Sequence, residues 1–553
     1  PKTPRRQRQM CIRDRRSPIP YDAIASLQVE TAPYDTQFNG FTGGTINAVT
    51  QSGTNEFHGS LSYFTTDDSM AGDRIGDRTV NRSFDEEGYA FTLGGPIIED
   101  KLFFFVAYEH FEESAAFRTG PQGSGALNEV DVTAAEAQQI SQIAQSVYGL
   151  DTGSFSGVPP VEDDKILVNL DWNITDQHRA RLTYINTDGA SISEQNGNNF
   201  VQGADVAFPS SWYNRSEVIE SWIAHVYSDW TPNFSTEFKY ATTTQATGQD
   251  SLLGAEFPQI SIGGLGSQGN SVIAFGPDRF RHGNSLDQEF TQYKALATYI
   301  YGDHAFQFGF EREEVDVNNL FAQNSEGTYG FATIADFQNN TPFEVTYNNA
   351  ITNDENDLRA IWGYNVNSLY IQDEWNVSPT LTLLGGLRYD WYESEGSIRE
   401  NANFQSRYGY TNTTDLEGLD VLMPRFGFTW DAMDNLTVRG GIGRFSGGAP
   451  TVWVSNSYSN DGVISDGVES GDFPGVTPYL PTSPDAATGQ YIQPEYLAAL
   501  ASGNPDGQVN ALHPDFEIPS TLKANIGFAY NLDFGTSEDW TVSLDLLYND
   551  YEN

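Results

Sequence analysis

The chain has 553 residues with 75 acidic and 29 basic side chains, a formal net charge of −46 and a single Cys. This charge repels phosphate backbones and argues against a nucleic-acid partner, and one Cys excludes a disulfide scaffold. The many glycines (52) and aromatics (35 Phe, 28 Tyr, 10 Trp) favour β structure over a helical bundle or a disordered acidic chain.

The first sixteen residues differ in composition from everything that follows. Seven of them are basic and one is acidic, and no apolar stretch of the kind a secretory signal needs follows them. Residues 6–15 read RQRQMCIRDR, which resembles a translated sequencing adapter. We therefore predict that residues 1–16 are a non-native segment, and we base no thiol chemistry on Cys11.

A glycine-rich stretch precedes the first long strand. Residues 43 and 44 are both Gly and lead into a short predicted strand, residues 45–50, while Gly53 lies in the turn that follows it. Glycine most easily adopts the tight or left-handed backbone that such a handover needs. The residues expected to form a hinge here are Gly43, Gly44, Asn47, Gly53, Thr54 and Asn55.

From His58 onward the main signal is a period of two. In residues 522–531 the apolar positions Ile526, Phe528 and Tyr530 alternate with smaller or polar ones such as Asn525 and Asn531. In a strand, neighbouring side chains point to opposite faces, so each run has an apolar face and a polar face. Counting these runs predicts about fifteen strands.

The connections between the runs alternate between short and long. The short ones are expected at residues 97–100, 174–177, 231–233, 302–303, 377–379, 431–435 and 534–539. The long ones, rich in Gly, Asn, Asp and Ser, are expected at residues 67–86, 112–162, 187–210, 247–285, 315–361, 393–417 and 447–514. All long loops then lie at one end of an up-and-down antiparallel sheet.

This asymmetry is typical of an outer-membrane β-barrel, in which alternate residues face lipid and lumen. No run reaches the roughly 20 apolar residues of a membrane-spanning helix, so a membrane crossing must use strands. A soluble propeller or sandwich is the alternative, although neither places a long loop at every second connection. The expected aromatic belt near the strand ends comprises Trp172, Tyr184, Trp230, Trp375, Trp391, Trp430 and Trp540.

The long loops are expected to contain little regular structure, with one exception. Residues 132–148 place Ile140, Ile143 and Ala144 on one face, and Thr133 with Glu136 forms a capping-box pattern. We expect a short helix there, packed on its own loop.

Two groups in the longest loop are candidates for binding. Trp453, Asn456 and Tyr458 place aromatic rings beside polar groups, a composition typical of recognition surfaces. Carboxylates with glycines between them can hold Ca²⁺, and the candidates are Asp461, Asp466 and Asp472. Because acidic residues are spread over the whole chain, a solvated acidic surface is the alternative interpretation.

Motifs for catalysis are not found. The seven His residues include no HExxH pattern, and no nucleophile elbow or P-loop occurs. Residues 441–446 nearly spell GxGxxG, but they lie on a predicted strand with no helix after it. The sequence therefore predicts no enzyme activity and no cofactor.

Several stretches together resemble TonB-dependent outer-membrane receptors, specifically the Oar-like subfamily. They are residues 24–35 and 40–59 (GFTGGTINAVTQSGTNEFHG), residues 93–96 and 100–105 (LGGP, DKLFFF), residues 370–375 (YIQDEW) and residues 424–428 (PRFGF). The resemblance covers the chain from about residue 18 to its end.

The resemblance implies an all-β, transmembrane antiparallel barrel of roughly 22 strands, of which about fifteen are present. It implies that residues 17–55 end a plug domain and that residues 56–553 form a barrel truncated at its C-terminal end. It further implies energised transport of a bulky ligand across the outer membrane of a Gram-negative bacterium. The partners would be outer-membrane lipid, an unknown extracellular ligand, and a TonB-type inner-membrane complex engaging a missing N-terminal box. A passive adhesin or structural barrel is the alternative.

Overall fold

The computed structural model describes residues 18–72, 74–76, 78–79, 83–155, 159–194, 205–447, 451–503, 507–532 and 540–552. The predicted non-native segment, residues 1–16, and the predicted turn at residues 534–539 lie outside these ranges. Within the described part of the chain, no helix is both long enough and apolar enough to cross a membrane.

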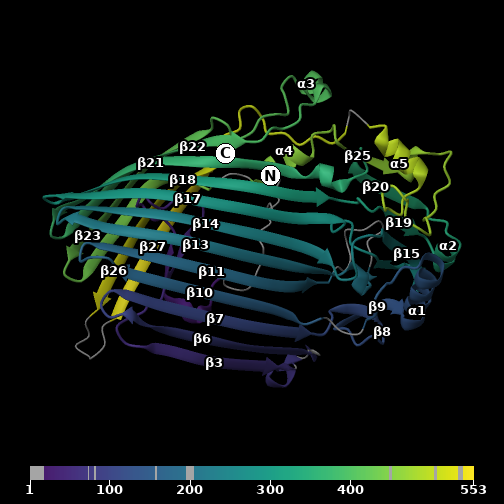
Figure 1. The fold of residues 1–553 in the computed structure, drawn as a ribbon, viewed down its shortest axis with the longest axis horizontal. Coiled ribbons are helices and arrows are strands. Elements are labelled where there is room, and N and C mark those ends of the chain that lie inside the picture. The colour runs from purple at the N-terminus through teal and green to yellow at the C-terminus, as the bar shows by residue number, and fades with distance from the viewer. Residues whose placement is uncertain are drawn as a thin grey trace.

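Fifteen antiparallel strands form one large curved sheet, which confirms the predicted number (Figure 1). Each pairs with the next in chain order, from β3 at one edge to β27 at the other. The strands are β3 (His58–Asp67), β6 (Phe84–Ile98), β7 (Leu102–Ala115), β10 (Val161–Asn173), β11 (His178–Ser193), β13 (Tyr213–Thr231), β14 (Phe234–Ser251), β17 (Gly283–Tyr301), β18 (His304–Ala322), β21 (Ala360–Ser378), β22 (Leu381–Glu395), β23 (Asp420–Met433), β24 (Leu436–Ser446), β26 (Ser520–Leu532) and β27 (Trp540–Glu552).

Short and long connections alternate as predicted. Between β17 and β18 only Gly302 and Asp303 intervene, and Gly302 adopts a positive φ of 61° that favours glycine. The described short turns lie at one end of the sheet, on the left in Figure 1, and the long connections lie at the other.

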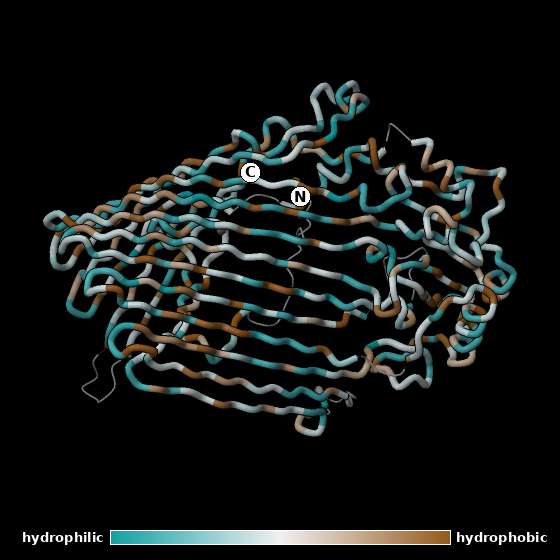
Figure 2. Tube along the Cα trace, in the orientation of Figure 1, coloured by the Kyte–Doolittle hydropathy of each residue, from teal (hydrophilic) through white to brown (hydrophobic). Residues whose placement is uncertain are grey.

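The two faces of the wall differ in polarity, as the alternation predicts. On β18, Phe306, Phe308 and Phe310 point to the outer face, whereas Gln307 and Glu311 point inward. The hydropathy of the strands alternates accordingly along the wall (Figure 2). Five Trp side chains near the short-turn end are exposed, namely Trp172, Trp230, Trp375, Trp430 and Trp540.

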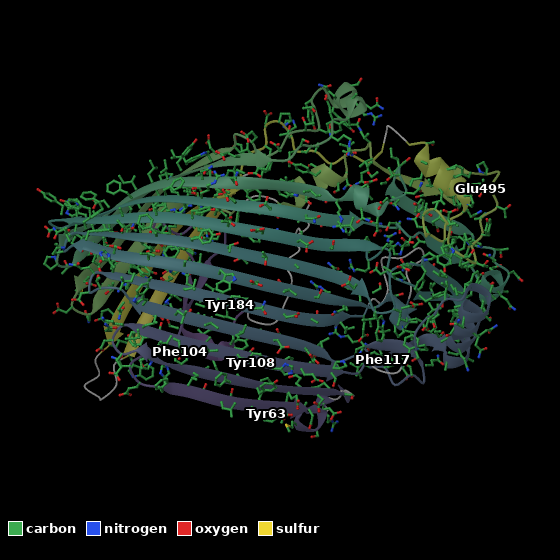
Figure 3. All side chains as sticks on the ribbon, in the orientation of Figure 1. Tyr63, Phe104, Tyr108, Phe117, Tyr184 and Glu495 are labelled. Atoms are coloured by element: carbon green, nitrogen blue, oxygen red, sulfur yellow. The ribbon has the colours of Figure 1, made fainter. Side chains whose placement is uncertain are left out.

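The predicted aromatic belt is correct at one end of the wall only. Trp391 lies toward the long-loop end of β22, and Tyr184 lies in the middle of β11, where it packs on Trp222 at 4.5 Å between ring centroids (Figure 3). The exposed Trp residues at the short turns are placed as an interfacial girdle requires.

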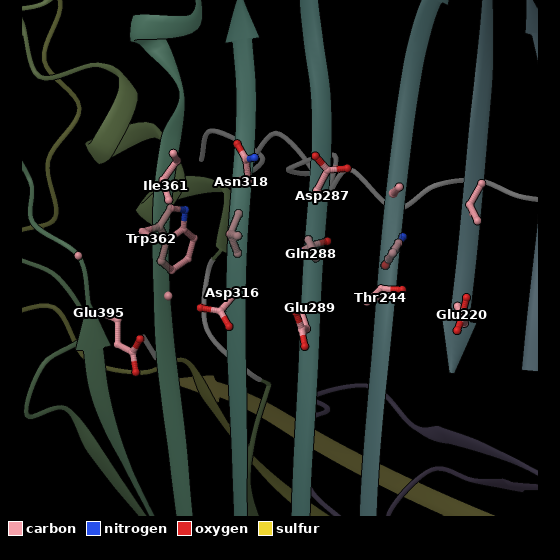
Figure 4. A pocket seen from close by; sticks show the side chains of 16 residues that line it. Glu220, Thr244, Asp287, Gln288, Glu289, Asp316, Asn318, Ile361, Trp362 and Glu395 are labelled. Carbon is pink, nitrogen blue, oxygen red and sulfur yellow. The ribbon is translucent and has the colours of Figure 1, made fainter. Parts of the chain in front are cut away.

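An acidic row on the outer face lies beyond the aromatic part of the wall, toward the long loops. Direct cross-strand pairing aligns Glu220, Thr244, Glu289, Asp316 and Gly363 on β13 to β21, and Glu395 follows on β22. These residues line a shallow groove of about 540 Å³ (Figure 4). Because charged side chains are costly on a lipid-facing surface, the row indicates where the apolar band ends.

The expectation of irregular long loops is wrong. Segments of four long connections form a six-stranded sheet in the order β12 (Val206–Ala207), β16 (Ser271–Phe275), β15 (Gln259–Leu265), β19 (Thr328–Phe331), β20 (Glu344–Ala350) and β25 (Ser465–Glu469). Its buried core includes Ile260, Phe275, Tyr329 and Tyr347. The loops therefore fold together into one body, here called the cap, at the right of Figure 1.

The predicted helix is present and belongs to the cap. It is α1 (Ala134–Ile143), which has the complete capping box of Thr133 and Glu136 and continues as a π-helical turn to Tyr148. It does not pack only on its own loop, because Tyr148 stacks on Phe337 of a different connection at 4.9 Å. The remaining helices of the long connections are α2 (Ile334–Gln338), α3 (Ala402–Tyr408), α4 (Thr451–Ser459) and α5 (Pro494–Ala501).

The assignment of faces predicts the effect of a charge placed on β26. Ile526 is exposed on the outer face, and Ala529 lies on the inner face because it is three positions away. In lipid vesicles, Ile526→Arg should lower the free energy of unfolding by about 2–4 kcal/mol, and Ala529→Arg by much less. Denaturant titration would measure both. Equal losses would show that the outward face does not contact lipid.

Candidate functional site

The lumen of the wall is crossed by the chain that precedes β3. β1 (Ile24–Glu30) and β2 (Thr45–Thr50) pair as an antiparallel hairpin, and residues 31–44 connect them. The end of the hairpin and the residues after it contact β7, β10 and β11. Asn169 Nδ2 of β10 donates to Gln51 O at 2.7 Å, Arg181 of β11 donates to Ser52, and Gly53 lies against Phe104 O of β7. The connecting segment contacts the opposite part of the wall, from β17, where Lys294 donates to Gln37, to β26, where Lys523 donates to Thr31 O. Residues 31–43, here called the luminal segment, thus span the lumen.

Three basic side chains of the wall, here called the basic clamp, bind the backbone of the luminal segment. Arg388 of β22 donates to Thr36 O at 3.2 Å, and Arg425 of β23 donates to Asp35 O at 2.8 Å and to Phe38 O. Lys523 of β26 donates to Thr31 O at 3.0 Å and also to Gly43 O. These contacts satisfy carbonyls that have no sheet partner.

Arg388 is held firmly in place. Only 4% of its side chain is exposed, and it bonds to Asp390 at 2.8 Å, Glu311 at 2.9 Å and Ser368 at 2.7 Å. A buried guanidinium needs such partners to offset its lost hydration. Asp390 in turn accepts a hydrogen bond from Asn39 of the luminal segment.

Side chains of the luminal segment fit into places where the wall has glycine. A methyl group on Gly441 would lie 2.5 Å from the ring of Tyr34, and one on Gly386 would lie 2.5 Å from Cγ2 of Thr36. Tyr34 also donates to Asn525 Oδ1 at 2.7 Å, and burial raises the pKa of its hydroxyl to about 12. The near-GxGxxG run at residues 441–446 thus has a packing explanation.

At two of the predicted hinge positions, any side chain larger than that of glycine would clash with a backbone oxygen atom. A methyl group on Gly44 would lie 2.7 Å from Glu30 O, and one on Gly53 would lie 2.3 Å from Phe104 O, whereas Gly43 has no atom within 4 Å. Asn55 bonds to Asp100 in the turn between β6 and β7. Asn47 pairs with Gln28 across the hairpin, and Thr54 bonds to Glu56. The hinge role itself stays a prediction.

The predicted ligand contacts lie on α4, at the mouth of the lumen. Trp453 is exposed, whereas Tyr458 stacks on Trp362 of β21 with ring centroids 5.6 Å apart. Asn456 is half-buried, and its carbonyl accepts the amide of Asn460. Trp453 is therefore accessible to a ligand, and Tyr458 is largely engaged with the wall.

The three calcium candidates are not gathered into one site. The Asp461 carboxylate is buried and bonds to Arg399 and to the amides of Val463 and Ile464. Asp466 lies on β25 opposite Asn349, and Asp472 lies in a separate 3-10 turn. In the described ranges, no group of three or more His, Cys, Asp or Glu side chains could hold a metal ion.

Sequence reasoning missed the basic clamp. Its three members are isolated basic residues on the inward positions of amphipathic strands, in a chain with 29 Lys and Arg in total. The small number of basic residues could have indicated the clamp, because a basic side chain that points into the lumen of an acidic protein needs a specific partner. The partners were not predictable, since they are backbone carbonyls hundreds of residues away.

Comparison with known proteins places the wall in a familiar group. Residues 49–541 match the family model of the outer membrane beta barrel domain. The TonB-dependent transporter Oar of Myxococcus xanthus is 36% identical over 135 residues, which is 22% of this chain and 13% of that protein. The chain thus spans only a small part of that relative.

Solved structures show the same fold. The outer membrane transporter YddB of Escherichia coli superposes with a TM-score of 0.52 at 12% identity, covering 92% of this chain and 54% of that one. The FrpB iron transporter of Neisseria meningitidis (F3-3 variant) gives 0.53 at 11% identity, covering 96% and 60%. At these identities the likeness concerns the fold.

The adjacent glycines before β2 provide a matched test of the hinge. Gly44→Val should force Glu30 away from β2 and disturb the seating of the luminal segment, whereas Gly43→Val should fit in open space. We expect several-fold faster entry of a small hydrophilic dye into cells carrying Gly44→Val only. Equal entry in both variants would contradict a spatial requirement at Gly44.

The clamp can be tested by hydrogen exchange. Arg425→Met removes the donor to two carbonyls, so amide exchange in residues 34–39 should accelerate by roughly ten-fold or more. Arg439→Met is the control, since Arg439 is an exposed arginine that bonds to Asp545 of β27. Unchanged exchange in the Arg425 variant would show that the clamp does not hold the segment.

Proposed function

The chain belongs to the outer membrane beta barrel domain family, and from this premise we propose that it is an energised transporter of a bulky ligand. It is a protein of the Gram-negative outer membrane, and the similar proteins described above are transporters, not enzymes. In this proposal residues 17–55 are the end of a plug domain, and residues 56–553 are barrel.

The observation that carries the proposal is the luminal segment and its polar attachment to the wall. A passive structural barrel gains nothing from a segment that crosses its lumen and is bound through single hydrogen bonds. Each such bond can be exchanged for one to water at a net cost of about 0.5–3 kcal/mol, so an applied force can release them one after another. The attachment is therefore firm at rest and reversible.

Energy would come from outside the chain. We propose a TonB-type complex of the inner membrane as the partner that pulls on the plug, by analogy with the Myxococcus relative, whose name states TonB dependence. An external ligand would favour release only to the extent that it binds the released state more tightly than the resting state. Trp453 at the mouth of the lumen is the proposed first contact.

One observation favours the alternative of a passive adhesin. The cap has its own buried core, so the external end presents a fixed surface instead of separate mobile loops. A fixed surface can bind a partner without any movement of the luminal segment. The two functions differ in whether that segment must move.

A disulfide lock separates these functions. Thr36→Cys with Gly386→Cys, in a Cys11→Ser background, should form a bond between the luminal segment and β22, because these positions are in contact. Thr36→Cys with Gly385→Cys is the control, since Gly385 faces the opposite side. Marker compounds are those that wild-type cells remove from the medium and a deletion strain leaves there. The readout is the loss of these compounds from the medium.

We expect the Gly386 pair to abolish depletion, a reductant to restore it, and the Gly385 pair to behave as wild type. Depletion that continues in the locked protein, with the disulfide verified by mass, would contradict transport through a moving plug. Cell adhesion that is unaffected by the lock would then favour the adhesin.

A further inference from the structure

An unbroken row of polar, mostly charged side chains crosses the inner face of the wall. Direct cross-strand pairing places Arg181, His225, Lys239, Lys294 and Glu311 side by side on β11, β13, β14, β17 and β18. Like charges directly opposite one another destabilise a sheet, and here Lys239 faces Lys294. In a chain with a net charge of −46, such a block of cations is not explained by folding.

Most members of the row have partners. Arg181 bonds to Asp171 at 2.6 Å, and Glu311 bonds to Arg388 at 2.9 Å. Lys294 bonds to Gln37 of the luminal segment at 2.9 Å and lies 3.7 Å from Glu237. Arg181, Lys294 and Glu311 therefore each have a partner.

Lys239 of the row and Glu313, two residues from Glu311 on β18, have no ion-pair partner among the described residues. Among the described residues, neither Lys239 nor Glu313 of β18 makes a hydrogen bond or an ion pair to a side chain. The two residues are separated by β17, so their backbones are roughly 10 Å apart across the sheet. Nearby, His225 Nε2 is buried and also has no partner.

These groups line one cavity of about 310 Å³ between the luminal segment and the wall. His225, Lys239 and Lys294 form its cationic side, and Glu311 with Glu313 forms its anionic side. Glu237 and Arg388 also line it: Glu237 lies 3.7 Å from Lys294, and Arg388 bonds to Glu311 at 2.9 Å. Lys239 and Glu313 are therefore the two charges of the lining that no ion pair compensates. Gln37 contributes an amide from the luminal segment. The cavity therefore has two poles.

We propose that this cavity binds a zwitterionic group of the short-peptide class, with the ligand carboxylate at Lys239 and its ammonium at Glu313. A phosphate or dicarboxylate would meet repulsion from Glu311 and Glu313, and a polycation would meet repulsion from the two lysines. A ligand with one charge of each sign completes both unpaired groups at once. The volume suits about a dipeptide.

The site also contacts the luminal segment. A carboxylate beside Lys239 competes with Gln37 for Lys294, so binding weakens one attachment of the segment. The role of this cavity as a subsite on the ligand's path rests on the proposed transport function. Binding to the cavity does not require transport.

The test is isothermal titration of the purified protein in detergent with L-alanyl-L-alanine. N-acetylation of the probe removes its ammonium, and C-terminal amidation removes its carboxylate. We expect the free dipeptide to bind at least about ten-fold more tightly than either blocked form. Equal affinities of the three probes, or no binding of any, would overturn the proposal.

Variants assign each pole. Lys239→Gln should remove the preference for the free carboxylate and keep the preference for the free ammonium, and Glu313→Gln should do the reverse. Glu314→Gln is the control, because Glu314 lies on the outer face and bonds to Arg312 at 2.7 Å. The same loss of affinity in the control, or no loss at Lys239 and Glu313, would overturn the assignment.

The outcome is separable from that of the transport proposal. Titration needs no energised membrane, so dipeptide binding without depletion of the medium by cells would contradict transport only. Depletion that depends on the unlocked luminal segment, together with no dipeptide binding, would contradict this inference only.

Discussion

Hydrogen bonds from Arg388, Arg425 and Lys523 to backbone carbonyls of residues 31–43 fix the luminal segment against the wall. The segment makes few apolar contacts with the wall, such as Phe41 with Phe445 at 5.5 Å between ring centroids. The cations of the wall and the carbonyls of the segment supply the polar part of the attachment. Water can hydrate both groups when the segment separates from the wall. The glycines at 386, 427 and 441 let the two backbones approach closely enough for these bonds to form. Side chains of the segment add to the attachment, because Tyr34 donates to Asn525 and Asn39 donates to Asp390.

Acidic and basic side chains are placed on different parts of the wall. Carboxylates are tolerated on the outer face beyond the apolar band, as in the row from Glu220 to Glu395, where water or headgroups solvate them. Several of the few basic side chains are instead placed in the lumen, where they bind the segment or pair with Glu and Asp. The cap lies at the long-loop end of the wall (Figure 1). Its shared core links segments of five long connections, so a displacement of one of them disturbs the packing of the others.

The sequence was sufficient for features that depend on neighbouring residues. Alternation predicted the strands and their faces, turn composition predicted the order of short and long connections, and Thr133 with Glu136 predicted the start of α1. It was insufficient for contacts between distant segments. The strands of the cap are short and lie in polar loops, so their hydrophobic residues, such as Ile260 and Tyr329, carry no clear period. The clamp was missed because its acceptors are carbonyls, which no side-chain pattern reveals.

At rest, residues 31–43 should occupy one fixed position across the lumen. Spin labels at Gly43→Cys and Gly385→Cys, in a Cys11→Ser background, report on it directly, because both positions have open space for a side chain. Pulsed electron resonance on the membrane-embedded protein should give a single narrow distance distribution, which broadens when Arg425→Met is added. A broad distribution in the protein with an intact clamp would show that the segment is not held by the wall.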